Sequence, residues 1–210
     1  TCRQMVQCGS HLTVRMFCMI IMVNSFMHQS SAFGGELLAA NSILFQIQFI
    51  MGDILTGLSQ AGAIYSGIAF GEHDRSMLND TLRISFIWAI GFGLLQTVGY
   101  YCCRHAILGC FTNLHNVIAT AQQYDLFIAF FPLISALGIV YYGVFNGALY
   151  TRPICISMLL TAGCYLTAYF TLIPLYGNIG LWLAFLIFYI ARSSFLLFFV
   201  PKLQQRVALA

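Results

Sequence analysis

Long apolar runs follow one another along this chain, separated by short breaks rich in glycine, proline or polar residues. The hydrocarbon core of a bilayer is about 30 Å thick, and a helix needs about 20 apolar residues to cross it. Six runs reach that length and predict membrane-spanning helices at residues 12–33, 38–70, 82–101, 124–150, 154–173 and 179–200. The predicted fold class is therefore all-α, a polytopic membrane protein with six transmembrane helices.

The second run is too long for one straight crossing. At the helical rise it would reach about 50 Å. We therefore expect it to be tilted, to bend near Gly52 or Gly57, or to project from the membrane. Two of the breaks are long enough to predict loops, a polar one at residues 71–80 and another at residues 102–123.

The distribution of Lys and Arg orients these predicted helices. Short cytoplasmic loops carry an excess of both residues. One side receives Arg3, Arg15, Arg75, Arg83, Arg152, Lys202 and Arg206, whereas the other receives only Arg104. The pattern predicts a cytoplasmic segment at residues 1–11, a transmembrane lobe at residues 12–200 and a cytoplasmic tail at residues 201–210.

Composition narrows the class of protein further. Only 7% of the residues are charged and 60% are hydrophobic, whereas a soluble domain carries roughly 25% charged residues. The formal net charge of +3 is too small and too scattered for a nucleic-acid binder. We expect the lipid bilayer as a partner and no nucleic acid, and we expect most of the eight cysteines to pack as small hydrophobes.

A carboxylate inside the second predicted helix is the first candidate for function. An ionisable residue at membrane depth is costly and is by default a functional hypothesis. At about 100° per residue, Asp53 shares one helix face with Ser42, Gln46, Thr56 and Gln60. This polar stripe is about 27 Å long, which favours a water-filled path or a cation site. Hydrogen bonding between helices is the alternative for Gln46 and for Asn146 on the fourth predicted helix.

Signals for catalysis or metal binding are weak. Residues 57–61 loosely resemble a nucleophile elbow, but Ser59 would lie in mid-helix, where that turn cannot form. Residues 102–105 and Cys110 do not have the spacing of a zinc site. We predict a protein that is not an enzyme and holds no metal. Tyr142 and its aromatic neighbours offer ring faces for cation–π contact with a substrate.

Several short stretches together resemble a known family. They are Arg15, residues 38–41 (Leu-Ala-Ala-Asn), residues 67–74 (Gly-Ile-Ala-Phe-Gly-Glu-His-Asp), Pro132 with residues 143–148, and residues 177–184 with Arg192. In order and spacing the chain resembles the carboxy-terminal half of a multidrug and toxic compound extrusion (MATE) transporter, in the branch of the DNA-damage-inducible protein F type.

The resemblance implies a twelve-helix antiporter of the bacterial inner membrane, with this chain as its second six-helix lobe. Such an antiporter exports cationic or amphipathic small molecules, uses H⁺ or Na⁺ as the coupling ion and needs no cofactor. The missing amino-terminal lobe would be the partner. We take the substrate or ion pathway to comprise Asp53, Gln46, Thr56, Gln60, Asn41, Tyr142 and Asn146.

Two departures from the family pattern affect that pathway. The branch usually has acidic residues where this chain has Thr56 and Tyr142, and its proton-carrying aspartate resembles one in the first lobe. Asp53 lies one turn before Thr56 and is positioned to supply the lost charge.

Two other functions stay open. A lipid-linked saccharide flippase of the same superfamily would need several basic residues in its cavity to meet a pyrophosphate. The sequence offers only Arg192, which we expect to anchor its helix by snorkelling toward the head groups. A six-helix remnant or partner subunit that transports nothing is the other alternative.

Overall fold

The computed structural model describes the backbone of residues 2–209 and the side-chain surroundings of residues 6–206, and it is helical with no strand in the described part. The helices are α1 (Cys2–Ala32), α2 (Gly35–Gly71), α3 (Arg75–Phe111), α4 (His115–Gln122), α5 (Asp125–Gly147), α6 (Arg152–Tyr176), α7 (Asn178–Leu197) and α8 (Val200–Leu209). Six helical spans are long and apolar enough to cross a membrane. The predicted all-α, six-span fold class is confirmed.

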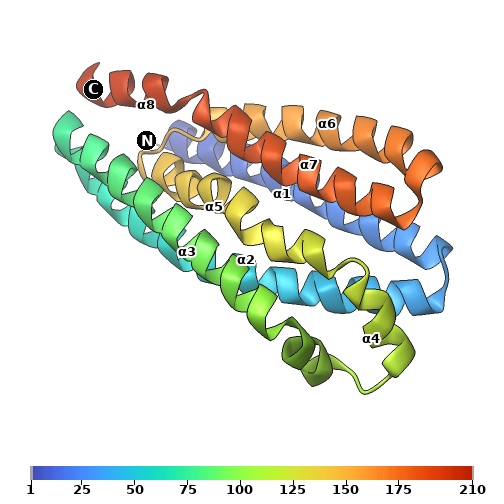
Figure 1. Cartoon of the computed structure of the whole chain (residues 1–210). Helices are drawn as coiled ribbons and strands as arrows, with labels where there is room; N and C mark the ends of the chain where they lie inside the picture. The colour runs from blue at the N-terminus through green and yellow to red at the C-terminus, as the bar shows by residue number, and fades with distance from the viewer. Residues whose placement is uncertain (1, 210) are drawn as a thin grey trace.

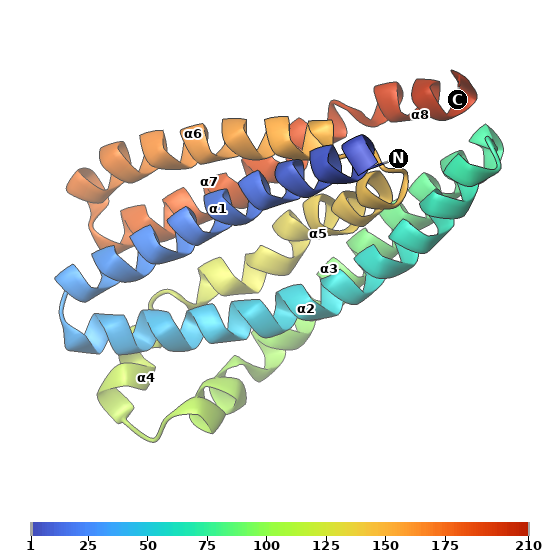
Figure 2. The same cartoon turned by 180° about the vertical axis from the view of Figure 1, so that it is seen from behind.

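The helices form an array around α5, which packs against α2 and α3 on one side and against α7 on the other. Helices α1 and α6 complete the side of α7 (Figure 1). The start of α1, the end of α8 and the α2–α3 turn lie at one end of the array, and α4 lies at the other (Figures 1 and 2). This arrangement agrees with an even number of crossings.

The helices extend beyond the apolar runs. Helix α1 already begins at Cys2, within the segment expected outside the membrane, and α3 spans Arg75–Phe111 rather than residues 82–101. The loops expected at 71–80 and 102–123 are therefore mostly helical, and the second of them also contains α4. Hydropathy marks what lies in lipid, whereas the backbone hydrogen bonds of a helix continue into polar sequence.

The turn between α2 and α3 is closed by a side-chain cap. Asp74 Oδ1 accepts hydrogen bonds from the backbone N–H groups of Ser76 at 2.8 Å and Met77 at 3.0 Å. These bonds satisfy donors that the first turn of α3 leaves without helical partners. Hydrogen bonding from Ser76 and Met77 holds the pKa of the Asp74 carboxyl below its ordinary value.

Helices α2 and α5 approach each other closely because glycines on α5 face the backbone of α2. A Cβ atom at Gly143 would overlap the carbonyl oxygen of Ser59, and one at Gly147 would overlap that of Ala63. Small residues at four-residue spacing permit this approach in membranes. The contact fixes the position of α2 relative to α5, and with it one wall of the cavity described below.

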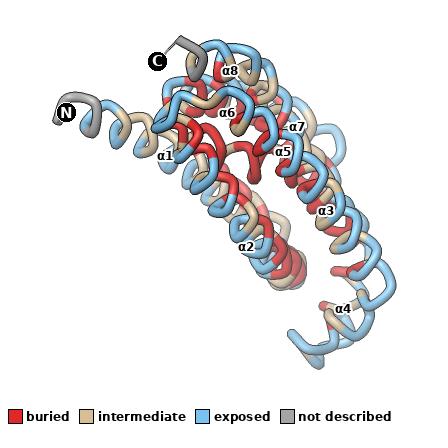
Figure 3. The backbone as a smooth tube through the Cα atoms, turned by 90° about the vertical axis from the view of Figure 1, so that its left-hand side faces the viewer, coloured by how far each residue is buried: buried red, intermediate tan, exposed pale blue. Residues whose placement is uncertain are grey.

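Aromatic side chains fill the space between α1, α2 and α7. Phe26 is fully buried, and its ring centroid lies 4.9 Å from those of both Phe45 and Trp182. Other helix faces carry exposed apolar side chains, such as Phe170 on α6. Figure 3 shows buried positions turned toward the interior of the array. An apolar exterior of this kind matches a lipid environment.

Candidate functional site

A cavity of about 140 Å³ lies between α1, α2, α5 and α7, and three charged side chains line it. It is lined by Arg15, Met19, Gln48, Phe49, Gly52, Asp53, Thr56, Ser59, Ile139, Tyr142, Tyr189 and Arg192. Charged and hydrogen-bonding groups from four helices thus converge on one space inside the array.

Arg15 reaches this cavity from α1 and is held by an aromatic ring. Its guanidinium carbon lies 4.0 Å from the centroid of the Tyr142 ring, and Nη1 donates to the Tyr142 hydroxyl at 3.4 Å. The Nε atom of Arg15 is buried and has no hydrogen-bond partner among the described residues. The cation–π contact orients the guanidinium without neutralising its charge.

Arg192 reaches the same cavity from α7. Its side chain is only 7% exposed, so the prediction that it snorkels to the head groups is wrong. The reason is its position on the inner face of α7, one turn after Tyr189, whose hydroxyl accepts from Gln48 Nε2 at 3.3 Å. In the described part of the chain, no ion pair or hydrogen bond engages the Arg192 guanidinium, and Gln48 Oε1 is buried without a partner.

Three of the predicted pathway residues meet at the cavity. Asp53 and Thr56 reach it from α2, one turn apart, and Tyr142 reaches it from α5. The Asp53 side chain is exposed and makes no ion pair within 4 Å with the described basic side chains. Thr56 Oγ1 donates to its own helix, to the carbonyl of Gly52 at 2.9 Å. Asp53 is therefore the one carboxylate in this cavity lining.

The other four predicted residues do not line this cavity. Gln46 and Gln60 are exposed on α2 and lie outside the cavity lining. Asn146 is half-buried on α5, one turn after Tyr142, and lies outside the cavity lining. The stripe is thus a cavity wall only in its middle part.

Asn41 is buried in a hydrogen-bond network that joins three helices. Its Nδ2 donates to Ser30 Oγ and to Asn178 Oδ1, both at 2.7 Å. Its Oδ1 accepts from Trp182 Nε1 at 3.0 Å. Every hydrogen-bonding atom of this side chain is used within the protein, so the geometry supports a structural role for Asn41.

A larger cavity of about 760 Å³ lies between α2 and α3 and reaches α5. Its walls are mainly apolar and aromatic, including Tyr65 and Trp88, and Asp74 and Asp80 lie at its polar end. Because both aspartates belong to the α2–α3 turn and the start of α3, this space opens near the end of the array at which α1 begins.

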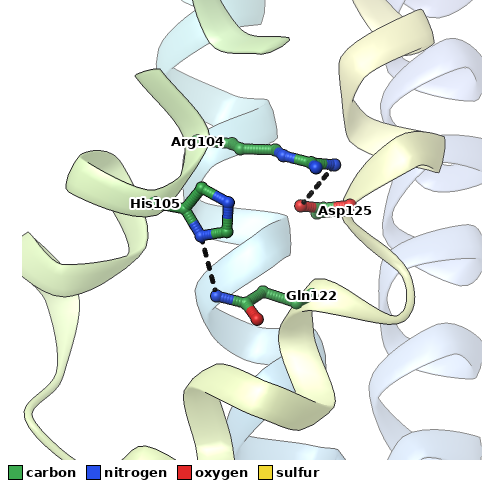
Figure 4. A network of polar contacts seen from close by, with 4 residues as sticks. All are labelled: Arg104, His105, Gln122 and Asp125. Atoms are coloured by element: carbon green, nitrogen blue, oxygen red, sulfur yellow. Dashed lines mark hydrogen bonds and ion pairs between the residues drawn. The ribbon is translucent and has the colours of Figure 1, made fainter. Parts of the chain in front are cut away.

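A polar cluster at the other end of the array ties α3 to α5 (Figure 4). Arg104 Nη1 lies 3.5 Å from Asp125 Oδ2, and the Asp125 side chain is 1% exposed. Next to this pair, His105 Nδ1 is hydrogen-bonded to Gln122 Nε2 at 3.1 Å. Arg104 was predicted as the one basic residue on this side of the membrane, whereas Asp125, at the very start of an apolar run, was not singled out.

Sequence reasoning also missed Gln48, Tyr189 and the second arginine of the cavity. Arg15 was counted only as a cytoplasmic charge, although it lies inside the first predicted span. A usable signal existed for Tyr189 and Arg192, which are three residues apart and share a helix face. Among residues whose side chains are described, no group of three or more His, Cys, Asp or Glu could hold a metal ion.

The fold and this cavity define a class: a polytopic helical membrane protein with charged side chains lining a cavity between its helices. Residues 12–173 match the MatE family, and the chain belongs to that family. The family and the structural neighbours of the chain are transporters, which points to a protein that is not an enzyme.

The DNA damage-inducible protein F of Escherichia coli (strain K12) is 28% identical over 160 residues, which cover 76% of this chain and 35% of that protein. A multidrug resistance MATE family transporter of the MOP superfamily, solved in an outward-facing conformation, shares the fold with a TM-score of 0.77 and 17% identity. That match covers 95% of this chain and 45% of the solved one.

A MOP superfamily transporter from Pyrococcus furiosus Vc1 (DSM3638) also shares the fold, with a TM-score of 0.77 and 17% identity, over 94% of this chain and 44% of its own. For that protein, a reverse polarity of the binding pocket suggests a different function. The chain thus spans about a third of the curated relative and less than half of these solved structures.

Proposed function

We propose that the chain acts as one lobe of a secondary active transporter that exports cationic or amphipathic small molecules by antiport with H⁺ or Na⁺. The observation that carries the proposal is the position of Asp53. Its carboxylate is exposed on the wall of the cavity between α1, α2, α5 and α7. An accessible carboxylate at membrane depth can bind a proton or a sodium ion and can release it again.

The mechanism would be alternating access between two lobes in the bacterial inner membrane, with both ends of the chain in the cytoplasm. A ligand shifts such an equilibrium only as far as it binds one state better than the other. Charging and neutralising Asp53 supplies that difference, because the charged form favours a hydrated cavity and the neutral form tolerates a closed one. A second six-helix lobe is the partner that this mechanism requires.

The test is the substitution Asp53→Asn in the protein as encoded, with whatever flanks residues 1–210. We expect the variant to insert into the membrane normally and to lose efflux of a fluorescent amphipathic cation driven by a pH or sodium gradient. Glu72→Gln is the matched control, since Glu72 is an exposed carboxylate in the α2–α3 turn, away from the cavity. Undiminished gradient-driven efflux by Asp53→Asn would exclude the proposed role of Asp53.

A lipid-linked saccharide flippase is the second candidate, and one observation favours it more than the sequence did. Two arginines, Arg15 and Arg192, line the cavity where the sequence offered one. Reconstituted vesicles carrying a lipid-linked saccharide distinguish the two functions, because flipping would expose the saccharide to an external lectin. Correctly inserted protein that moves neither kind of substrate would instead be a non-transporting remnant or partner subunit.

A further inference from the structure

We propose that Arg15 and Arg192 form a binding site for an oxyanion, the carboxylate, sulfonate or phosphate headgroup of an amphipathic molecule. The inference deepens the proposed function, since it names the chemical class of substrate, and it rests on that function for the step of transport. It predicts binding that is measurable without any transport.

The charges of the cavity are unbalanced in favour of an anion. Two guanidinium groups and a single carboxylate line it. Arg192 is buried, with only 7% of its surface exposed. Holding an arginine at membrane depth is costly, and such residues normally pair with an acid or with backbone carbonyls. Asp53 does not serve as that acid, because no described ion pair joins it to either arginine. A bound anion would complete the site.

The two arginines are held in position but keep hydrogen-bonding capacity. The Tyr142 ring and hydroxyl orient Arg15, while the buried Nε of Arg15 donates to no described group. Arg192 likewise has no hydrogen-bond acceptor within the described residues. A guanidinium presents its N–H groups in a planar fork that matches the two oxygens of a carboxylate, or of a phosphate or sulfonate.

The size of the cavity limits what it can hold. A drug-sized ligand needs roughly 300–1,000 Å³, whereas this space measures about 140 Å³. It can therefore take a headgroup, with the rest of the molecule outside. Met19, Phe49 and Ile139 line the same cavity and offer an apolar surface to the first carbons of a tail. The ligand that fits is an amphiphile with its anionic end inserted.

Three ten-carbon probes of different charge test this site. The protein as encoded is placed in nanodiscs of phosphatidylcholine, and equilibrium binding of labelled decanoate, decyltrimethylammonium and decanol is measured without a gradient. All three share the same tail, so the differences between them report on the headgroup. We expect decanoate to bind at least about tenfold more tightly than decanol, as one charge-assisted hydrogen-bonded pair would give.

Substitutions locate the binding. Arg15→Gln and Arg192→Gln should each lower the affinity for decanoate about tenfold or more, and neither should weaken the binding of decanol or of decyltrimethylammonium. Arg83→Gln removes one positive charge from an exposed position on α3, outside the cavity, and should leave decanoate binding unchanged. Because Arg192 is buried, Arg192→Gln could disturb folding. Arg192→Lys is therefore measured as well, since it keeps the positive charge and should fold and retain part of the affinity for decanoate.

The source of the oxyanion is decided by adding phosphatidylglycerol to the nanodiscs. Loss of decanoate binding on this addition assigns the site to a lipid headgroup, and unchanged binding assigns it to a soluble amphiphile. Decanoate binding no tighter than that of decanol, or unaffected by Arg15→Gln, overturns the proposal. Arginine-dependent binding without efflux would refute the transport function alone, whereas efflux without arginine-dependent decanoate binding would refute only the anion site.

Discussion

At the scale of single residues, the direction of a side chain decides its role more than its chemical type does. Asn41 and Asp53 are both polar residues within one apolar run, yet one is enclosed by hydrogen bonds and the other is exposed on a cavity wall. Arg83 and Arg192 are both arginines in or beside predicted spans, and only Arg192 is turned inward. Burial and partner atoms separate structural from functional candidates here.

The network around Asn41 predicts a loss of stability rather than a loss of substrate binding. Asn41→Ala leaves the buried donor of Trp182 and the amide of Asn178 without partners, which costs about 1–3 kcal/mol. We expect a lower midpoint of thermal unfolding in detergent, with decanoate affinity unchanged at temperatures where the variant is folded. Asn79→Ala removes only an exposed hydrogen bond with Gln204 and should change stability by less than about 0.5 kcal/mol. An equal loss in both variants would contradict the structural role of Asn41.

Three of the twelve residues that line the cavity were predicted from the sequence as pathway residues, for a physical reason. Helical periodicity places Asp53 and Thr56 on one face of one helix, and that relation is local. Tyr142, Arg15 and Arg192 meet them only through packing between helices, which no spacing along the chain encodes. Tyr142 entered the prediction as an aromatic ring face and as a departure from the family pattern, not through its packing. Arg15 was misjudged because a charge near a span end fits the positive-inside rule equally well.

At the scale of elements, hydropathy predicts which segments cross the membrane but not how far each helix runs. All six spans were found, since lipid requires apolar side chains over a fixed thickness. The ends of α3 and the presence of α4 depend on helix formation outside the lipid, where capping and hydrogen bonding decide. Cys18 and Gly143, both inside spans, pack closely against their surroundings. The expectation that most cysteines pack is wrong for Cys102, Cys103 and Cys110, which are exposed.

The contact between α2 and α5 predicts strict size limits at one glycine. In Gly143→Ala the new methyl group would overlap the backbone of Ser59, so the two helices must move apart. We expect destabilisation of about 1–3 kcal/mol from overpacking, together with weaker decanoate binding, because Ser59 and Tyr142 belong to the cavity wall. Thermal unfolding and the binding assay measure the two effects.

The control for this substitution is Gly91→Ala on α3. No atom lies within 4 Å of a Cβ built there, so the alanine should raise helix stability by up to about 1 kcal/mol. If Gly143→Ala is as stable as Gly91→Ala, the close approach of α2 and α5 is not a feature of the folded protein.

At the scale of the whole molecule, the array has two distinct ends and a cavity lined by charged side chains between them. The start of α1 and the end of α8 share one end (Figure 1), and the Arg104–Asp125 pair joins α3 to α5 toward the other (Figure 4). The cavity with Arg15 and Arg192 lies between these ends, as the proposed alternating-access cycle requires. The Lys and Arg distribution predicts which end faces the cytoplasm.

Native cysteines allow this orientation to be measured. Cys110 is exposed near the end of α3, and Cys8 lies in the first turns of α1, at opposite ends of the array. In variants that keep only one cysteine, a membrane-impermeant maleimide added to intact cells should label Cys110 and should label Cys8 only after permeabilisation. Labelling of Cys8 from outside, with Cys110 protected, would reverse the orientation that the Lys and Arg distribution predicts.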